Sequence, residues 1–296
     1  MVRPTGRPKC AEERRLLMST DVGTFTLANG VAIPQVGFGT WQIPPGDAAY
    51  EATRVALDAG YRHIDTALAY GNEASVGQAI RDSGLDRDDV FVTTKLPGEV
   101  KTAAGAREAF ETSARNLGLG NVDLYLVHAP WPWDEIGADY SAQNVEVWRV
   151  LEDFYHSGQA RAIGVSNFTV ADLEALTAET SVLPAANQIR WFIGNTQPAT
   201  TAWCQERGVL VEGYSPLATG GLLDNAQLCE IAERHGRSAA QVALRYLLQK
   251  NVLPLPKSTT PARIRQNLEL DFVLGSDDLA ALDALAPTGP AGPFNS

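Results

Sequence analysis

Short apolar runs alternate with longer amphipathic stretches along the chain from residue 36 onward. The runs predict strands at residues 36–39, 61–64, 90–94, 124–127, 162–165, 186–188, 210–213 and 252–255. In the stretches between them apolar side chains recur about every 3.6 residues, which predicts helices at 48–59, 73–82, 104–117, 144–157, 170–178, 198–207 and 239–249. This regular alternation indicates an α/β fold in which eight parallel strands close into a barrel.

Two features outside the repeat complete the predicted architecture. Asn29-Gly30, between the runs 24–27 and 31–33, predicts a β-hairpin that we expect to close the bottom of the barrel. A further helical pattern at 226–235 fits an insertion after the seventh strand. The doubly wound alternative lacks its G-x-G-x-x-G fingerprint after any strand. We therefore expect a (β/α)8 TIM barrel with an N-terminal hairpin and extra helices late in the chain.

Composition and charge narrow the classes of function. The chain has 296 residues, of which 45% are hydrophobic, and its formal net charge of -11 argues against nucleic-acid and anionic-membrane partners. Its three cysteines form no C-x-x-C pair, so they suggest neither a disulfide framework nor a zinc site. No apolar run is long enough to span a membrane, and charged residues stand where a signal sequence has its apolar core. We expect a cytoplasmic protein with a mobile tail at 1–21 and a single barrel domain at 22–296.

Four side chains that can carry or transfer a proton follow three neighbouring predicted strands. Asp65 and Tyr70 come after the second strand, Lys95 after the third and His128 after the fourth. The carboxyl ends of barrel strands lie on one rim, so these side chains should meet there. Taken singly, each has a structural explanation: the aspartate as a loop cap, the lysine as a solvated side chain, and the histidine and tyrosine as packing. Together they predict a proton-donating site without a metal.

The chemistry of these side chains suits the reduction of a carbonyl group, which needs a hydride from a dinucleotide and a proton for the developing alkoxide. Tyr70 is the candidate proton donor, and the pKa of a free tyrosine is about 10. We expect Lys95 to lower this pKa towards working pH, and Asp65 to compensate the buried charge of the lysine. His128 would donate to the carbonyl oxygen and orient it.

The sequence resembles the aldo-keto reductase family, and within it the bacterial 2,5-diketo-D-gluconic acid reductases, over residues 24 to about 285. The matching motifs are Gly60 to Glu73, Thr93-Thr94-Lys95-Leu96, Leu126-Val127-His128, Gly164 to Phe168, Asn187-Gln188, Tyr214-Ser215-Pro216-Leu217 and Leu255 to Thr259. The resemblance implies NADPH-dependent reduction of an aldehyde or ketone, with Asp65, Tyr70, Lys95 and His128 as the catalytic tetrad.

The resemblance also implies a binding site for NADPH across the barrel mouth. The residues implied for the carboxamide, nicotinamide ring and pyrophosphate are Ser166, Asn167, Gln188, Tyr214, Ser215 and Leu217, and those for the 2′-phosphate and adenine are Lys257, Ser258, Arg263, Gln266 and Asn267. Lys257 and Arg263 also flank hydroxyl side chains and a helix start at Pro261, which is a chemistry that binds phosphate and favours NADP over NAD. Without the resemblance, scattered charge on a surface helix would explain them as well.

Residues expected to contact the substrate are Trp41, His128 and Trp131. The family often has an aromatic residue where this chain has Ala129, and we expect its loss to reshape the pocket. Trp131 and Trp133 could refill the space from another angle.

A second departure follows Gln188, where Arg190-Trp191-Phe192 replaces the usual Glu-Tyr-His. The arginine could attract a carboxylate or phosphate on the substrate, or it could face solvent. The segment after Ala286 is short, which suggests an open pocket.

The leading hypothesis is an NADPH-dependent carbonyl reductase that acts on a small-molecule substrate, and the resemblance implies a monomer. One alternative is a binding protein that senses the cofactor without turning over a substrate. Another is a barrel isomerase or aldolase, which would need a different base or a Schiff-base lysine and would leave Lys257 and Arg263 without a role.

Overall fold

A computed structural model describes residues 23–286 of the chain. It begins with a two-stranded antiparallel hairpin, β1 (Thr24–Thr26) and β2 (Ala32–Pro34). Eight parallel strands follow in the order of the sequence: β3 (Phe38–Gly39), β4 (His63–Asp65), β5 (Phe91–Leu96), β6 (Val122–Val127), β7 (Ala160–Ser166), β8 (Ala186–Arg190), β9 (Leu210–Tyr214) and β10 (Val252–Leu255). The predicted tail at 1–21 and the segment after Ala286 lie outside the described residues.

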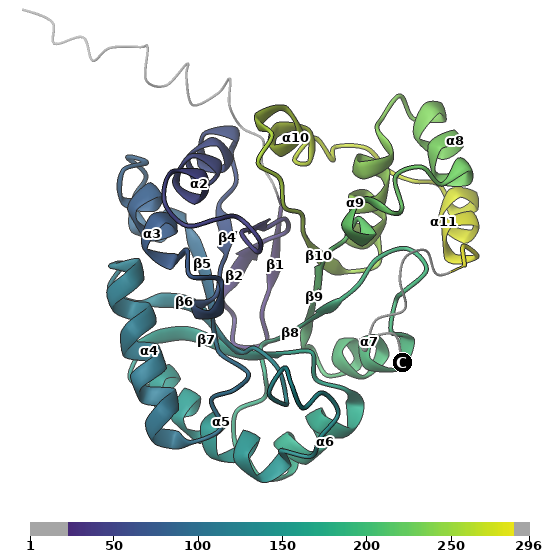
Figure 1. Cartoon of the computed structure of the whole chain (residues 1–296). Coiled ribbons are helices and arrows are strands. Elements are labelled where there is room, and N and C mark those ends of the chain that lie inside the picture. The colour runs from purple at the N-terminus through teal and green to yellow at the C-terminus, as the bar shows by residue number, and fades with distance from the viewer. Residues whose placement is uncertain (1–22, 287–296) are drawn as a thin grey trace, which may run out of the picture.

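The sheet closes on itself as a barrel, as predicted (Figure 1). The nitrogen of Gly37 donates to the oxygen of Pro254 at 3.1 Å, and the nitrogen of Gly39 donates to the oxygen of Pro256 at 3.0 Å. These bonds join the first strand to the last. A Cβ on Gly37 would overlap the ring of His63 and the side chain of Leu255, so the first strand can approach the last only without a side chain there.

Helices surround the barrel on its outside (Figure 1). They are α2 (Asp47–Ala59), α3 (Glu73–Arg81), α4 (Ala103–Leu117), α5 (Ser141–His156), α6 (Val170–Ala178), α7 (Pro198–Glu206), α8 (Ala226–Arg234), α9 (Ala239–Gln249), α10 (Pro261–Gln266) and α11 (Ser276–Asp283). All the predicted helices are present, including the insertion α8 after the seventh barrel strand. In the described residues none of these helices is both long and apolar enough to cross a membrane.

Most predicted boundaries shift by no more than two residues, one helix begins three residues early, and one helix was not predicted. Helix α5 begins at Ser141, three residues before the predicted start, because the apolar period that marks the helix begins only inside its first turn. Strand β3 is reduced to two residues, since the pairing with β4 begins at Phe38. Helix α11 has no counterpart in the prediction, because its first turn is polar and Leu282 is its one buried residue.

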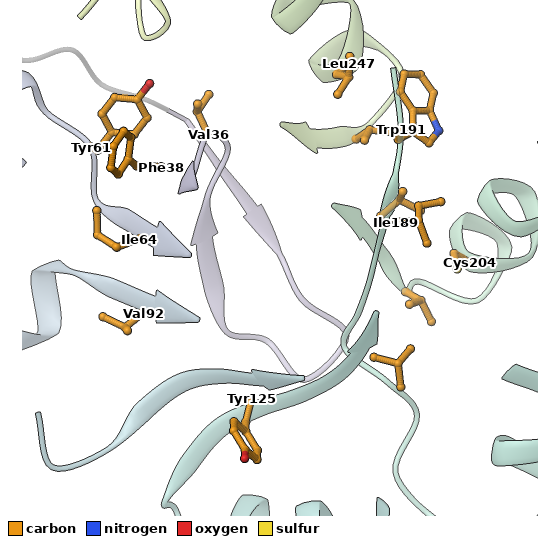
Figure 2. Packing of buried hydrophobic residues seen from close by; sticks show 14 of the residues in the cluster. Val36, Phe38, Tyr61, Ile64, Val92, Tyr125, Ile189, Trp191, Cys204 and Leu247 are labelled. Atoms are coloured by element: carbon orange, nitrogen blue, oxygen red, sulfur yellow. The ribbon is translucent and has the colours of Figure 1, made fainter. Parts of the chain in front are cut away.

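Most of the apolar core lies between the outer face of the barrel and the helices. Figure 2 shows this layer on two sides of the barrel. On one side the rings of Phe38 and Tyr61 lie edge to face, with their centroids 5.6 Å apart. On the other side Trp191 and Leu247 lie side by side beyond the end of β8. Gly213 allows this second contact, because a Cβ there would meet both Trp191 and Leu247. The strands therefore present alternate residues to the helices and leave the others to fill the barrel.

The hairpin closes the bottom of the barrel, as predicted. Leu27 and Ile33 are buried against residues at the amino ends of the strands, among them Phe91, Leu124 and Leu253. The side chain of Asn29 donates to the backbone oxygen of Arg161 at 2.9 Å, which ties the turn to β7. With the bottom filled, the opposite rim is the open end of the barrel.

Candidate active site

The four predicted tetrad residues meet at the carboxyl-terminal rim. Asp65 ends β4, Lys95 lies near the end of β5, and His128 follows β6 directly. Tyr70 lies in a short 3-10 helix, Leu68–Tyr70, in the loop after β4. Parallel neighbours bring these strand ends together, with Asp65 paired to Thr93 and Lys95 paired to Leu126 in the sheet register.

Lys95 is the centre of the cluster and is fully buried. Its Nζ lies 2.8 Å from both carboxylate oxygens of Asp65 and donates to the backbone oxygen of Thr66 at 2.8 Å. The same Nζ is 3.4 Å from the hydroxyl oxygen of Tyr70, and that hydroxyl is 3.5 Å from Nε2 of His128. The phenol is therefore held between a cation and an imidazole.

The pKa values of Lys95 and Tyr70 are both raised above their ordinary values. Burial alone lowers the pKa of Lys95, but the charge and hydrogen bonds of Asp65 and Tyr70 outweigh it and raise the pKa above its ordinary value. Burial raises the pKa of Tyr70, and the charge of Lys95 lowers it only in part. Lys95 lowers the pKa of Tyr70 in the expected direction, but the pKa does not fall below its ordinary value, because desolvation of the phenolate exceeds the attraction of the cation. The result is a protonated phenol beside a charged lysine.

His128 is neutral at physiological pH, because burial and the nearby charge of Lys95 lower its pKa well below the ordinary value. Among the described residues its Nδ1 has no hydrogen-bond partner, while Nε2 faces the Tyr70 hydroxyl. The ring of Trp133 packs edge to face against the imidazole of His128, with the ring centroids 5.5 Å apart.

A buried glutamate that was not predicted as a site residue, Glu212, joins the cluster from β9. The side-chain nitrogen of Gln188 donates to Asp65 at 2.9 Å and to Glu212 at 2.8 Å. Glu212 is fully buried, and burial followed by the charge of Asp65 raises its pKa from 4.5 to about 7. Because both hydrogens of the Gln188 amide are used, its carbonyl oxygen remains to accept a hydrogen bond.

A cavity of about 1000 Å³ opens above the tetrad and extends along the rim to β10 and α10. It is lined by Asp65, Tyr70 and His128, and by all eleven residues predicted for the cofactor: Ser166, Asn167, Gln188, Tyr214, Ser215, Leu217, Lys257, Ser258, Arg263, Gln266 and Asn267. Lys95 lies beneath it, without contributing to the wall. The structure thus brings residues from distant parts of the sequence into one elongated site.

Near the tetrad the cavity wall is rich in fixed polar groups. The Ser166 hydroxyl donates to the backbone oxygen of Gln188 at 2.8 Å, and the Asn167 side chain donates to the backbone oxygen of His128 at 3.0 Å. The hydroxyl of Tyr214 donates to Asn167 at 2.8 Å. Asn167 adopts a left-handed backbone with φ 63° and lines the cavity.

The far end of the cavity is cationic. Lys257 and Arg263 are exposed there, and Ser258 between them accepts a hydrogen bond from the Thr260 nitrogen at 3.1 Å. Helix α10 has only six residues, so the side chains provide most of the attraction for an anion at this end.

Of the residues predicted for the substrate, two line the cavity and one does not. Trp41 lines it with 47% of its surface exposed, and His128 lines it beside the tetrad. Trp131 is buried behind Trp133, with ring centroids 5.4 Å apart, and Trp133 forms the wall instead.

This exchange follows from how the loop after β6 is held. Lys101 donates to the backbone oxygen of Ala129 at 2.9 Å and to the side chain of Asn144 at 2.8 Å, and Asn144 donates to the backbone oxygen of Pro130 at 2.8 Å. These bonds turn the loop so that its second tryptophan reaches His128.

Residues 35–287 match the sequence model of the Aldo/keto reductase family. The chain belongs to the aldo/keto reductase family. It is 41% identical to the glyoxal reductase of Bacillus subtilis over 271 residues, which cover 91% of this chain and 95% of that protein. Its structure resembles that of an aldo/keto reductase from Brucella melitensis with a TM-score of 0.83 and 41% identity, covering 88% of this chain and 98% of the other. An aldo-keto reductase from Bombyx mori, solved in complex with NADP, has a TM-score of 0.81 and 34% identity, and the match covers 88% of this chain and 92% of that one.

Two residues that distinguish this aldo/keto reductase reach the cavity without having been predicted as site residues. Trp133 could have been found from its place five residues after His128, although its neighbour Trp131 fits the same argument. Arg190 was noted as a departure from the family pattern with two open interpretations, and its side chain lines the cavity.

Proposed function

We propose that this aldo/keto reductase reduces an aldehyde or ketone to an alcohol with NADPH, and that Tyr70 supplies the proton. The observation that carries the proposal is the position of the Tyr70 hydroxyl, 3.4 Å from the Lys95 ammonium and 3.5 Å from the His128 imidazole at the wall of the cavity. A protonated phenol between these groups can give its proton to a carbonyl oxygen.

The residues along the cavity fit a dinucleotide phosphate. The side-chain carbonyl oxygen of Gln188, whose amide nitrogen donates to Asp65 and Glu212, suits the NH2 group of a carboxamide, and Ser166 and Asn167 line the same cavity. At the other end Lys257 and Arg263 suit a 2′-phosphate. When bound, NADPH would supply the hydride for the carbonyl carbon.

Each member of the tetrad then has a role set by its geometry. Asp65 keeps Lys95 charged, and the charged ammonium stabilises the phenolate that remains after proton transfer. His128 is neutral, so in its Nε2-protonated form it can donate to the carbonyl oxygen and orient it. Water is excluded from the ammonium because Lys95 is fully buried, which strengthens its effect on the phenol.

The relative named glyoxal reductase supports small aldehydes as the first substrates to test. Membership of the diketogluconate subgroup, a monomeric state and a cytoplasmic location stay predictions from the sequence.

A hydride-transfer experiment tests the proposal. Purified protein is incubated with NADPH carrying deuterium at both C4 positions, together with methylglyoxal, an aromatic aldehyde, an aldose or a diketo sugar acid. We expect the alcohol product of at least one substrate to contain deuterium at the former carbonyl carbon, with equal consumption of cofactor. Binding of NADPH without any labelled alcohol would favour the cofactor-sensing alternative.

A further inference from the structure

Arg190 is a buried cation on the wall of the active-site cavity. It ends β8 and lies on the same face of the strand as Gln188, two residues earlier, which contacts Asp65. Its side chain lines the cavity although the residue is only 9% exposed. Its neighbour in the sheet register is Tyr214, and the charge of Arg190 lowers the pKa of that tyrosine, although burial outweighs it and leaves the pKa raised.

The guanidinium has no acidic partner in the described part of the chain. The side chains of Asn195 and Gln197 donate to the backbone oxygen of Arg190, and the guanidinium carbon lies 5.2 Å from the centroid of the Phe192 ring. A ring provides much less compensation than a carboxylate, so the five N–H donors of this arginine are available to a ligand.

The other buried cations in residues 23–286 are satisfied differently. Lys95 has the carboxylate of Asp65, and Lys101 has a backbone oxygen and the amide oxygen of Asn144. Arg190 is therefore the exception, and a buried charge without a partner is unfavourable unless a ligand supplies one. Such a group at the wall of a cavity indicates a binding role.

We infer that Arg190 binds a carboxylate carried by the carbonyl substrate, so that the enzyme prefers aldehydes or ketones with an acidic group. The inference rests on the proposed reductase function and adds the class of substrate. A guanidinium and a carboxylate match in geometry and form two parallel hydrogen bonds, which fix orientation as well as affinity.

The position of Arg190 favours the substrate over the cofactor phosphates as the source of the anion. Two residues of strand rise place it about 7 Å above Gln188, at the tetrad end of the cavity. The exposed cations Lys257 and Arg263 occupy the opposite end. An acidic group a few bonds from the reacting carbonyl can therefore reach Arg190 while the carbonyl oxygen reaches Tyr70.

The experiment compares matched acidic and neutral aldehydes. Wild-type protein and the variants Arg190→Met and Arg190→Lys are assayed with NADPH on 4-carboxybenzaldehyde and its methyl ester, and on succinic semialdehyde and butanal for a shorter reach. The dissociation constant for NADPH is measured for each protein by fluorescence, and thermal unfolding is recorded.

We expect Arg190→Met to lower kcat/KM for at least one acid by about 10- to 100-fold, the range of a hydrogen bond to a charged group. For the matched neutral aldehyde, kcat/KM should change by less than about threefold, because a substitution that removes no contact with the substrate has a small effect. Arg190→Lys should retain part of the preference, because it keeps the charge without the paired donors. The thermal midpoint of Arg190→Met should be unchanged or higher, as expected when an uncompensated buried charge is removed.

Equal losses of kcat/KM on the acid and the ester in Arg190→Met would show a structural role and overturn the inference, whether or not the thermal midpoint also falls. A selective loss of NADPH affinity, with the acid preference intact, would assign the arginine to a cofactor phosphate and overturn it too. If the wild-type protein turns over none of the four aldehydes, the proposed function fails first and the inference falls with it.

Discussion

Glu212 illustrates how a single buried residue links the tetrad to the rest of the barrel. One of its oxygens accepts from Gln188, and the other has no partner within the described residues. In the middle of a strand a glutamate is most often solvated, so the sequence alone gives no reason to choose it. Only closure of the barrel places it inside, next to Gln188 and within the field of Asp65.

This burial makes stability depend on pH. The pKa of Glu212 is raised from 4.5 to about 7 in the folded protein, so between these values the folded state binds more protons than the unfolded state. The contribution is fully present below pH 4.5 and is lost as the pH rises through about 7. We expect wild-type protein to lose roughly 2–3 kcal/mol more unfolding free energy than Glu212→Gln between pH 5 and pH 8. Urea titrations of both proteins at the two pH values measure this difference, and parallel losses would refute it.

We expect Lys257 to determine the preference of the enzyme for NADPH over NADH. It is exposed at the cationic end of the cavity, where the 2′-phosphate of NADP is expected. In Lys257→Met the dissociation constant for NADPH should rise by about 10- to 100-fold, because a charge-assisted contact is lost. The constant for NADH, which lacks this phosphate, should change by less than about threefold and serves as the control. Equal weakening of both cofactors would place the lysine elsewhere on the dinucleotide, and no change in either constant would show that it binds neither.

At the scale of the elements, close approaches explain what helix propensity does not. Gly77 in α3 faces the last residue of α4, where an added Cβ would overlap the backbone of Leu117. Arg81, one turn later, donates to the same Leu117 oxygen. The two helices are therefore joined at a point that tolerates only glycine.

Gly77→Ala should destabilise the protein, although alanine is the better helix former by about 1 kcal/mol. The clash with the α4 backbone should lower the unfolding free energy by about 1–3 kcal/mol, as overpacking does in other cores. Gly105→Ala in α4 is the matched control, because its Cβ would meet only the side chains of Val100 and Thr102. Denaturant unfolding of both variants tests the contrast, and equal stabilities would contradict it.

The elements themselves were largely predictable from the sequence. The eight runs and seven helical periods are strong local signals, and glycines such as Gly60 and Gly118, which take left-handed conformations, mark helix ends. Helix α11 and the early start of α5 were not predicted, because their exposed turns carry no apolar period. Which of Trp131 and Trp133 lines the cavity was also not predictable, since long-range hydrogen bonds from Lys101 and Asn144 hold the loop in place.

At the scale of the molecule, the site is a product of closure. Asp65 and Gln188 are 123 residues apart and become hydrogen-bonded neighbours only inside the barrel. The position of the tetrad at the strand ends could be predicted because parallel strands share one rim. The direction of the Tyr70 pKa could not, because it depends on how far burial outweighs the attraction of Lys95.

The central claim, that Tyr70 supplies the proton in an NADPH-dependent reduction, is tested most directly by turnover of Tyr70→Phe beside the wild-type protein, with NADPH affinity measured for both. Removing the hydroxyl leaves the ring, so the cavity should keep its shape and the dissociation constant for NADPH should change by less than about threefold. We predict that kcat falls by about 10²- to 10⁴-fold, the usual contribution of a general acid. A Tyr70→Phe protein that binds NADPH and reduces the carbonyl at the wild-type rate would contradict the account.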